Sequence, residues 1–351
     1  MAALAPDPGP QPGQLPYLTP ETPGIGGEIK QSPAHFEVEE IPLYPPAGVG
    51  GHLYLNLTRE GQTTRDLVDA ACRVLGLNPA GVGYAGLKDK EARVSQTLSF
   101  EDAGLDPAEA GRRLAAALDV RVNWASRHGN KLKPGHLLGN RFRILVQAPG
   151  EGAAAAAELT ARLLRERGVA NFFGPQRFGQ EGDNAARGRE LVLGARPPRQ
   201  KWLKNLYLSA YQSELFNRWL AARLGRGEFL RLLAGDVAKK TDTGGLFTVE
   251  DPVAEEPRLT RGEITYTGPL YGAKMMPARA EAGRFEDELL AAEGLEPAQL
   301  KKAHLPGSRR PARIFAEGLA VEEEPRGLWF SFALPKGSYA TVVLREFMKR
   351  G

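Results

Sequence analysis

Two spacings of apolar residues divide most of the chain into short strands and helices. Apolar residues at every second position predict strands at residues 27–31, 35–41, 52–57, 82–85, 94–98, 141–146, 327–334 and 339–344. Apolar residues three and four positions apart predict helices at residues 65–75, 108–118, 153–167, 184–193 and 207–224. Strands and helices are therefore interspersed in the first half, helices dominate the middle, and strands return at the end.

This order predicts an α+β protein with a central antiparallel or mixed sheet. The strands after residue 327 share the β-branched and aromatic composition of the first half, so we expect the chain to close back onto the first sheet, with the middle as an insertion. Residues 1–24 are rich in Pro and Gly and lack periodicity, which predicts a flexible or loosely packed arm.

Composition narrows the class of protein. A length of 351 residues favours two domains, and 42% apolar with 25% charged residues is typical of a soluble globular protein. No apolar run reaches the roughly 18 residues of a membrane helix, and the N-terminus lacks the pattern of a signal peptide. Cys72 is the single cysteine, and the five histidines show no metal-ligand spacing. We therefore expect a cytoplasmic protein without a metal centre.

One carboxylate stands out at a predicted turn. Residues 82–85 favour a strand, Gly86 allows a turn, and Leu87 is expected to anchor that turn in the core. Asp89 follows between Lys88 and Lys90, whose ammonium groups favour the ionised carboxylate. Asp89 is thus a candidate nucleophile or base, although the same residues also fit a solvated turn.

A basic segment follows this turn. Between residues 121 and 143 there are six Lys or Arg residues and no Asp or Glu, with Trp124 and Phe142 among them. Such a segment fits a phosphate backbone, although it equally fits a solvated face. Further on, residues 171–179 place three Phe residues among glycines, next to Arg177. This stretch is either a packed loop or a stacking surface.

Five separated stretches together resemble the TruD-type tRNA pseudouridine synthases. They are residues 85–90 (AGLKDK), 127–133 (RHGNKLK) with 139–142 (GNRF), 171–179 (NFFGPQRFG), 209–210 (SA) with 216–217 (FN), and 334–340 (LPKGSYA). They occur in the order of that family and span roughly residues 28 to 348. The resemblance implies an enzyme that converts a uridine of tRNA, uridine 13 in bacterial members, to pseudouridine without a cofactor or metal.

The resemblance also implies an organisation and a set of site residues. The expected domains are a pseudouridine-synthase catalytic domain at residues 25–172 and 308–351, and an inserted α+β TRUD domain at residues 173–307. Asp89 takes the catalytic role. The expected substrate-binding residues are Asn140, Phe142, Lys30, Phe36 and Lys88. The expected RNA contacts are Arg127, His128, Lys131, Lys133, Arg141, Arg177 and Phe178.

Alternatives remain at several of these positions. Phe142 also fits a core strand and Asn140 a turn, while Arg177 and Phe178 equally fit packing between the two domains. The chain as a whole also fits an RNA-binding protein or chaperone that keeps the fold without chemistry. A glycosidase is a weaker fit because it needs two paired carboxylates, and Glu91 is the one acid near Asp89. We expect tRNA as partner and a monomeric protein.

Overall fold

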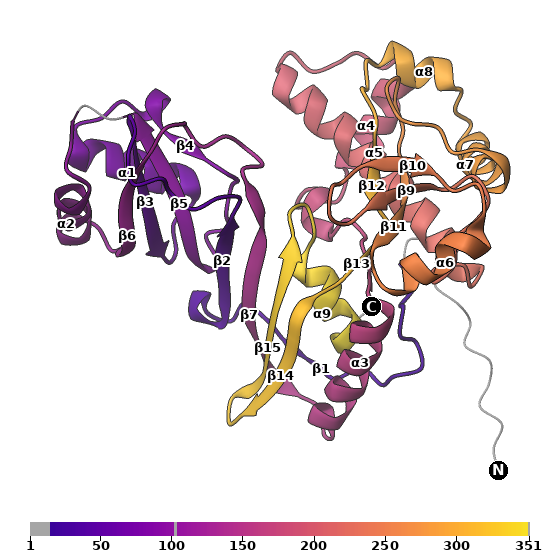
Figure 1. Cartoon of the computed structure of the whole chain (residues 1–351), viewed down its shortest axis with the longest axis horizontal. Helices are drawn as coiled ribbons and strands as arrows, with labels where there is room; N and C mark the ends of the chain where they lie inside the picture. Colours follow the sequence, from indigo (N-terminus) through magenta and orange to yellow (C-terminus); the bar gives the residue numbers. More distant parts are fainter. Residues whose placement is uncertain (1–14, 102–103, 350–351) are drawn as a thin grey trace.

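A nine-stranded mixed sheet forms the centre of the computed structural model, which describes residues 15–101 and 104–349 (Figure 1). Its main order is β14-β15-β7-β2-β5-β3-β6, with β1 added to β7 and β4 to β5. The β2–β5 pair is parallel, and the other pairs of this sheet are antiparallel. The strands are β1 (Gly26–Glu28), β2 (Phe36–Pro42), β3 (His52–Arg59), β4 (Gly83–Tyr84), β5 (Arg93–Glu101), β6 (Arg121–His128), β7 (Leu137–Pro149), β14 (Glu317–Glu324) and β15 (Gly327–Pro335). This is the predicted α+β class with a central mixed sheet.

Helices cover one face of the sheet in two groups. Helices α1 (Thr64–Leu75) and α2 (Pro107–Ala117) bury their apolar residues against β3 and β5, in a core that includes Leu55 and Leu98. Helices α3 (Ala153–Arg167) and α9 (Ala340–Met348) pack over the other half of the sheet. In Figure 1 the two groups of helices lie on either side of β7.

Alternation along the strands separates the two faces of the sheet. On β2 and β7, Phe36, Phe142 and Ile144 point to the face that carries the helices, and this side is called the helix face below. Glu39 and Arg141, one position away, point to the opposite side, called the open face. The two faces carry different chemistry, apolar and aromatic on one and charged on the other.

A second sheet lies in the middle of the chain. Its strands, in the order β10-β9-β11-β12, are β9 (Val237–Lys240), β10 (Leu246–Thr248), β11 (Ile264–Leu270) and β12 (Ser308–Pro311). Around it lie α4 (Asn184–Val192), α5 (Lys201–Gly225), α6 (Pro252–Thr260), α7 (Ala280–Ala292) and α8 (Pro297–Lys302), and a small pair joins β8 (Val169–Ala170) to β13 (Arg313–Ile314). Trp219 of α5 and Tyr266 of β11 share one hydrophobic core with Phe330 of β15. The two sheets are therefore joined by continuous packing.

Two elements differ from the sequence-based expectation. The strand predicted at residues 339–344 is wrong, because these residues begin α9. Its apolar run is too short to distinguish a strand from a buried helix, and packing decides: Phe347 of α9 stacks edge-on against Phe330 of β15, with ring centroids 4.7 Å apart.

The expected loose arm is also wrong for residues 15–24. Thr19 and Thr22 are fully or almost fully buried. The carboxylate of Glu346 in α9 accepts hydrogen bonds from the backbone N–H groups of Leu18 and Thr19 and from the Thr19 hydroxyl. These contacts hold the segment against the last helix. The first part of the expected arm, residues 1–14, lies outside the described residues.

Candidate active site

Asp89 lies on a turn that is held by polar side chains from below. The Gly86 carbonyl accepts a hydrogen bond from Nε2 of Gln96 at 2.6 Å, and the backbone N–H of Lys88 donates to the Thr64 hydroxyl at 2.9 Å. Leu87 does not anchor the turn as predicted, because its side chain is 62% exposed. Since the buried space beneath is already occupied by the Thr64 and Gln96 side chains, the leucine points outward.

The cation that pairs with Asp89 is distant in sequence. Nζ of Lys30 lies 2.5 Å from Oδ2 of Asp89, and Oδ1 accepts a hydrogen bond from the backbone N–H of Glu91 at 3.1 Å. Partial burial raises the pKa of the Asp89 carboxyl, but the hydrogen bond and charge of Lys30, together with backbone N–H groups, outweigh it. The pKa of Asp89 therefore lies below its ordinary value, and the carboxylate is ionised at neutral pH.

The side chain of Lys88, expected at the substrate, points inward. Its side chain is 8% exposed, and its ammonium lies 3.1 Å from Oε1 of Glu40 and donates to Oδ1 of Asn140 at 2.6 Å. Asn140 therefore contacts Lys88, and among the described residues no hydrogen bond joins it to Asp89. The turn thus directs one of its charged side chains outward and the other into the sheet.

Aromatic rings form the floor next to this turn. Phe36 and Phe142 meet edge to face with centroids 6.4 Å apart, and Phe142 lies 5.6 Å from Phe332. Nζ of Lys30 lies 5.0 Å from the centroid of Phe36, which connects the floor to the ion pair with Asp89. Phe332 was not singled out from the sequence. Only the pairing of β15 with β7, which places it opposite Phe142, reveals its position.

The basic segment does not form one continuous patch. Arg141 points to the open face, where it pairs with Glu39 at 2.9 Å, whereas its neighbours Asn140 and Phe142 face the other way. Arg127 donates to the backbone carbonyl of Leu105, and His128 stacks on Tyr44 with centroids 4.8 Å apart. Strand alternation thus divides residues that are contiguous in sequence between two surfaces.

The remaining candidates for RNA contact lie in the connections between β6 and β7 and between β8 and α4. Lys131 donates to the carbonyl of Ala80, and Lys133 lies in the same exposed loop. Nε of Arg177 donates to the hydroxyl of Ser213 on α5, and Phe178 packs against the main core. The contacts of Arg177 and Phe178 are those of residues packed between segments, which was one of the two alternatives.

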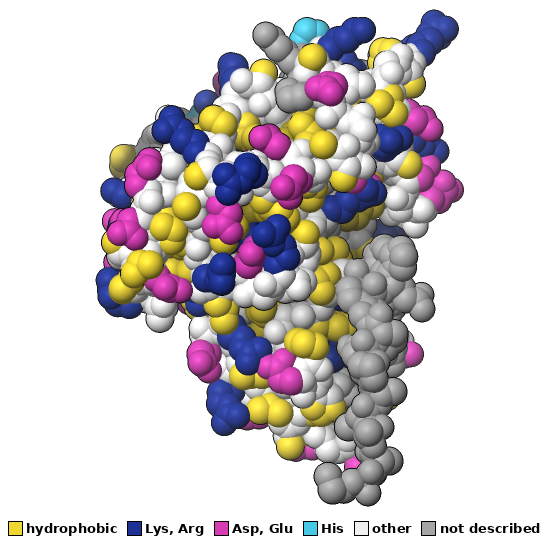
Figure 2. Space-filling model, turned by 90° about the vertical axis from the view of Figure 1, so that its right-hand side faces the viewer, with side chains coloured by type: hydrophobic (Ala, Val, Ile, Leu, Met, Phe, Trp, Pro, Cys, Tyr) yellow, Lys and Arg dark blue, Asp and Glu magenta, His cyan; other side chains and the backbone are white. Residues whose placement is uncertain are grey.

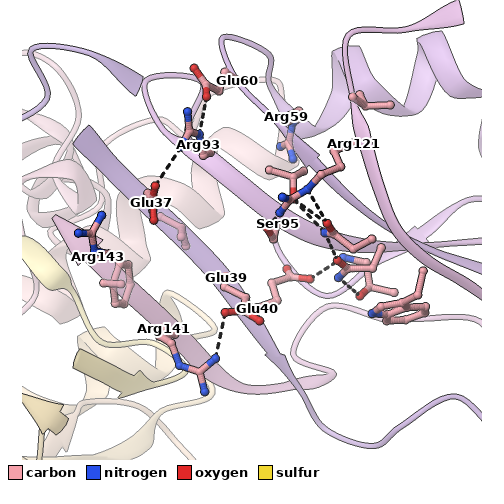
Figure 3. A pocket seen from close by; sticks show the side chains of 18 of the residues that line it. Glu37, Glu39, Glu40, Arg59, Glu60, Arg93, Ser95, Arg121, Arg141 and Arg143 are labelled. Carbon is pink, nitrogen blue, oxygen red and sulfur yellow. Dashed lines mark hydrogen bonds and ion pairs between the residues drawn. The ribbon is translucent and has the colours of Figure 1, made fainter. Parts of the chain in front are cut away.

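A large groove lies on the open face of the sheet. It has a volume of about 1240 Å³, and Figure 3 shows charged side chains of β2, β5 and β7 along it. Arg93 bridges Glu37 and Glu60, and Arg141 pairs with Glu39. Asp89 does not line this groove. These carboxylates are neutralised by arginines, which makes them poor candidates for catalysis.

Two features are absent from the described residues, a cluster of metal-ligating side chains and a membrane-spanning helix. Among the residues that the structure describes, no group of three His, Cys, Asp or Glu side chains has the arrangement of a metal site. No helix in residues 15–101 or 104–349 is both long and apolar enough to cross a bilayer. The molecular face in Figure 2, on the side of α6 and α7, shows Lys and Arg interspersed with Asp and Glu.

Comparison with known proteins relates this fold to one family. The family model described as tRNA pseudouridine synthase D (TruD) matches residues 13–197 and 195–347. A protein of Anaeromyxobacter sp. (strain Fw109-5) named tRNA pseudouridine synthase D is 47% identical over 344 residues, covering 96% of this chain and 96% of that protein. One of the same name from Thermus thermophilus is 46% identical, covering 97% of this chain and 93% of that protein.

A solved structure agrees with these sequence relationships. The crystal structure of a Methanosarcina mazei protein described as a putative tRNA pseudouridine synthase D (TruD) covers 94% of this chain and 95% of its own, with a TM-score of 0.75 and 23% identity. At that identity the likeness establishes a shared fold, the fold of a pseudouridine synthase. On the sequence matches, the chain belongs to the tRNA pseudouridine synthase D (TruD) family and is an enzyme of the isomerase class.

Proposed function

We propose that this chain isomerises uridine 13 of tRNA to pseudouridine, with Asp89 as the catalytic carboxylate. The observation that carries the proposal is the position of Asp89, a carboxylate that Lys30 keeps ionised beside the rings of Phe36 and Phe142. The side chain of Asp89 is 48% exposed, so a nucleotide can reach it. The family relationship supports the reaction and the substrate class.

The reaction needs few groups from the protein. Pseudouridylation breaks the N1–C1′ bond, turns the uracil within the site and forms a C5–C1′ bond. C5 then loses its proton and N1 gains one, so the product is an isomer and no co-reactant is consumed. An ionised Asp89 can begin by attacking C1′ or C6, or by stabilising a cationic sugar and removing a proton from C2′. Phe142 supplies a face that keeps the detached uracil in place.

Substrate binding has to bring a base out of folded RNA. Flipping a nucleotide costs a few kcal/mol, which phosphate contacts can offset, and such contacts make affinity strongly salt-dependent. The main proposed contacts with the phosphate backbone are Arg127, His128, Lys131 and Lys133. Arg141, Arg177 and Phe178 are proposed as secondary contacts, because Arg141 points to the open face and the other two pack against α5 and the main core.

The proposal includes an organisation of the chain. Residues 25–172 and 308–351 form the catalytic domain, and residues 173–307 form an inserted TRUD domain. Pairing of β15 with β7 supports the discontinuous catalytic domain, and a second sheet built largely within the middle of the chain supports the insertion. We propose that the protein acts as a cytoplasmic monomer without a metal ion.

The test is pseudouridine formation in unmodified tRNA transcripts, mapped to the nucleotide. Wild type is compared with Asp89→Asn and with Asp119→Asn, a control that removes a carboxylate from the open-face groove. We expect product at uridine 13 with wild type and Asp119→Asn, no product with Asp89→Asn, and similar tRNA affinity for all three. A wild type that binds tRNA without forming pseudouridine would instead favour the RNA-binding alternative.

A further inference from the structure

Three polar side chains, two of them buried and one half-buried, form a network at the Asp89 turn. They are Glu40 of β2, Lys88 of the turn and Asn140 of β7. The side chains of Lys88 and Glu40 are 8% and 4% exposed, so the pair is removed from solvent. A buried ion pair is a weak source of stability, because desolvation offsets the attraction of its charges. A role other than stability is therefore expected for it.

The Lys88 ammonium determines the orientation of the Asn140 amide. An ammonium group only donates hydrogen bonds, so the Asn140 atom 2.6 Å from Nζ must be the carbonyl oxygen, Oδ1. The NH₂ group of Asn140 then points away from Lys88. Asn140 shares the helix face of β7 with Phe142, so its NH₂ group lies on the face that carries the aromatic floor.

Glu40 is itself fixed by the sheet. Its Oε2 accepts the backbone N–H of Thr97 at 3.0 Å, and Oε1 lies 3.4 Å from Nε2 of Gln96. Backbone pairing between β2 and β5 ends at Glu39 and Ser95. The Glu40 carboxylate therefore takes the place of the missing backbone partner on β2. Gln96 also holds the Gly86 carbonyl, so one network connects the strands to the turn.

We propose that Glu40 and Lys88 are positioning residues for the reaction proposed above. Glu40 holds the ammonium group of Lys88 in place. Lys88 in turn orients the Asn140 amide so that its N–H groups face the substrate. Lys88 also holds the peptide that precedes Asp89. This role rests on the proposed function. Lys88 thus acts through Asn140 and the turn, and its buried ammonium does not touch the nucleotide.

The test separates positioning from stability with a double variant. Lys88→Met leaves Glu40 buried without its cation, so we expect this single variant to lose both thermal stability and activity. Glu40→Met/Lys88→Met replaces the pair by apolar side chains, a change that is often neutral for stability. We expect the double variant to regain the melting temperature but to keep a kcat lowered on the order of a hundredfold, as misplaced groups cause.

The outcomes distinguish this proposal from the function on which it rests. A double variant with wild-type kcat would overturn the positioning role, and so would one whose loss is entirely in KM for tRNA. Inactive wild type would overturn the proposed function and the positioning role with it. If the double variant does not fold, Asn140→Asp decides the question: it keeps an acceptor for Lys88 but removes the N–H groups. The proposal requires it to lose kcat while retaining stability.

A second, independent observation concerns the connection between α4 and α5 together with the first turn of α5. The exposed cations Arg196, Arg199 and Lys201 lie here with the half-buried Lys204, and with the side chain of Trp202, which is 66% exposed. The name α4–α5 surface is used for these five residues. No acid occurs in the sequence between Glu190 and Glu214, and within the described part of the chain these four cations form no ion pair. In Figure 1 this connection lies at the upper end of the middle part of the chain.

The composition of this surface fits RNA. Trp219 and Trp329 are only 1% and 8% exposed, so the exposure of Trp202 is unusual for this chain. Exposed aromatic rings stack on unpaired bases while neighbouring cations contact phosphates. Arg93 and Arg141 of the open-face groove, in contrast, form ion pairs with glutamates. We infer that the α4–α5 surface contacts an unpaired loop of the tRNA outside the site around Asp89.

Binding measurements test this inference. We expect Trp202→Ala to weaken affinity for a tRNA transcript about tenfold, the size expected for one stacked base, and Trp202→Phe to weaken it less. Lys201→Ala/Lys204→Ala should lower the salt dependence of binding, whereas Arg73→Ala/Arg162→Ala, with the same charge change on α1 and α3, should not. Unchanged tRNA affinity of Trp202→Ala would overturn the inference. The inference would also be overturned if Trp202→Ala or Lys201→Ala/Lys204→Ala lost binding to phosphatidylserine vesicles but not to tRNA.

Discussion

Lys30 reaches Asp89 from a backbone conformation that lysine rarely adopts. Its φ is 62°, in the left-handed region, and its ammonium lies 2.5 Å from the Asp89 carboxylate. Such a conformation costs about 1–3 kcal/mol for a residue other than glycine and persists where the surrounding structure enforces it. The strain and the ion pair occur in one residue, which supports a functional role for this contact.

Removing the Lys30 charge should change the pH dependence of the reaction. In Lys30→Met the partial burial of Asp89 is no longer outweighed by the ion pair, so the pKa of Asp89 rises. Because the ionised form is the reactive one, the acid limb of the kcat profile should move to higher pH, measured over about pH 4 to 8. Lys90→Met is the matched control, since among the described residues the ammonium of Lys90 makes no hydrogen bond to this carboxylate. Superimposable profiles of Lys30→Met and wild type would contradict this role.

Phe142 contributes to both the core and the site. It is 7% exposed between Phe36 and Phe332, so Phe142→Ala should lower the free energy of unfolding by about 3–5 kcal/mol. Denaturant titration measures this loss. Phe178→Ala, at a partly buried ring, serves as control and should cost less. A loss below that of the control would mean that Phe142 is a site residue without a core function.

Local signals predicted those parts of the fold that depend on neighbouring residues. The predicted helix at residues 65–75 lies within α1, where Thr63 and Asp66 form a capping box and Gly76 ends the helix with φ of 73°. The strand at residues 141–146 lies within β7, and the strand at 327–334 within β15. In each case the pattern is long enough to identify the element without knowledge of its partners.

The site could be predicted only in part, because its contacts are between residues far apart in sequence. The turn made Asp89 a candidate, but the ammonium that pairs with it belongs to Lys30, while that of the adjacent Lys88 pairs with Glu40. Phe332 joins the floor through strand pairing, and Arg141 leaves it through strand alternation. Neither effect can be derived from the sequence before the register of β7 is known.

A buried ion pair in the middle of the chain gives a prediction about stability. Burial raises the pKa of Glu286, and Arg309 lowers it through a two-pronged contact at 2.7 and 2.9 Å. Arg309→Met leaves the carboxylate uncompensated, which should cost about 3–5 kcal/mol in unfolding free energy at neutral pH.

The pH dependence of this variant has a definite sign. The raised pKa means that the folded state binds the proton of Glu286 more tightly than the unfolded state, so the fold gains stability at low pH and loses it as pH rises. Arg309→Met should therefore be closer to wild type at about pH 5 than at about pH 8. Thermal melts at both values check this, with Arg309→Met/Glu286→Met as the control that should lack the difference.

The contact between residues 15–24 and α9 gives a fourth prediction. Glu346 is 2% exposed and accepts hydrogen bonds from Leu18 and Thr19. Glu346→Ala leaves these donors buried without partners and should cost about 1–3 kcal/mol. Hydrogen exchange of the Leu18 and Thr19 amides should accelerate. Glu158→Ala, which breaks an exposed pair with Arg165, should change stability by less than about 1 kcal/mol, and equal effects would contradict the account.

The position of β15 between β14 and β7 has a consequence for biosynthesis. Gly327 to Pro335 pair with residues 139–147, so one edge of β7 stays open until the last part of the chain has left the ribosome. At ordinary rates of translation this interval is on the order of ten to forty seconds. An unpaired strand edge with apolar neighbours invites aggregation, so we expect nascent chains to be prone to aggregation during that interval. A message truncated before residue 327 would yield an aggregation-prone protein without Phe332 and without activity.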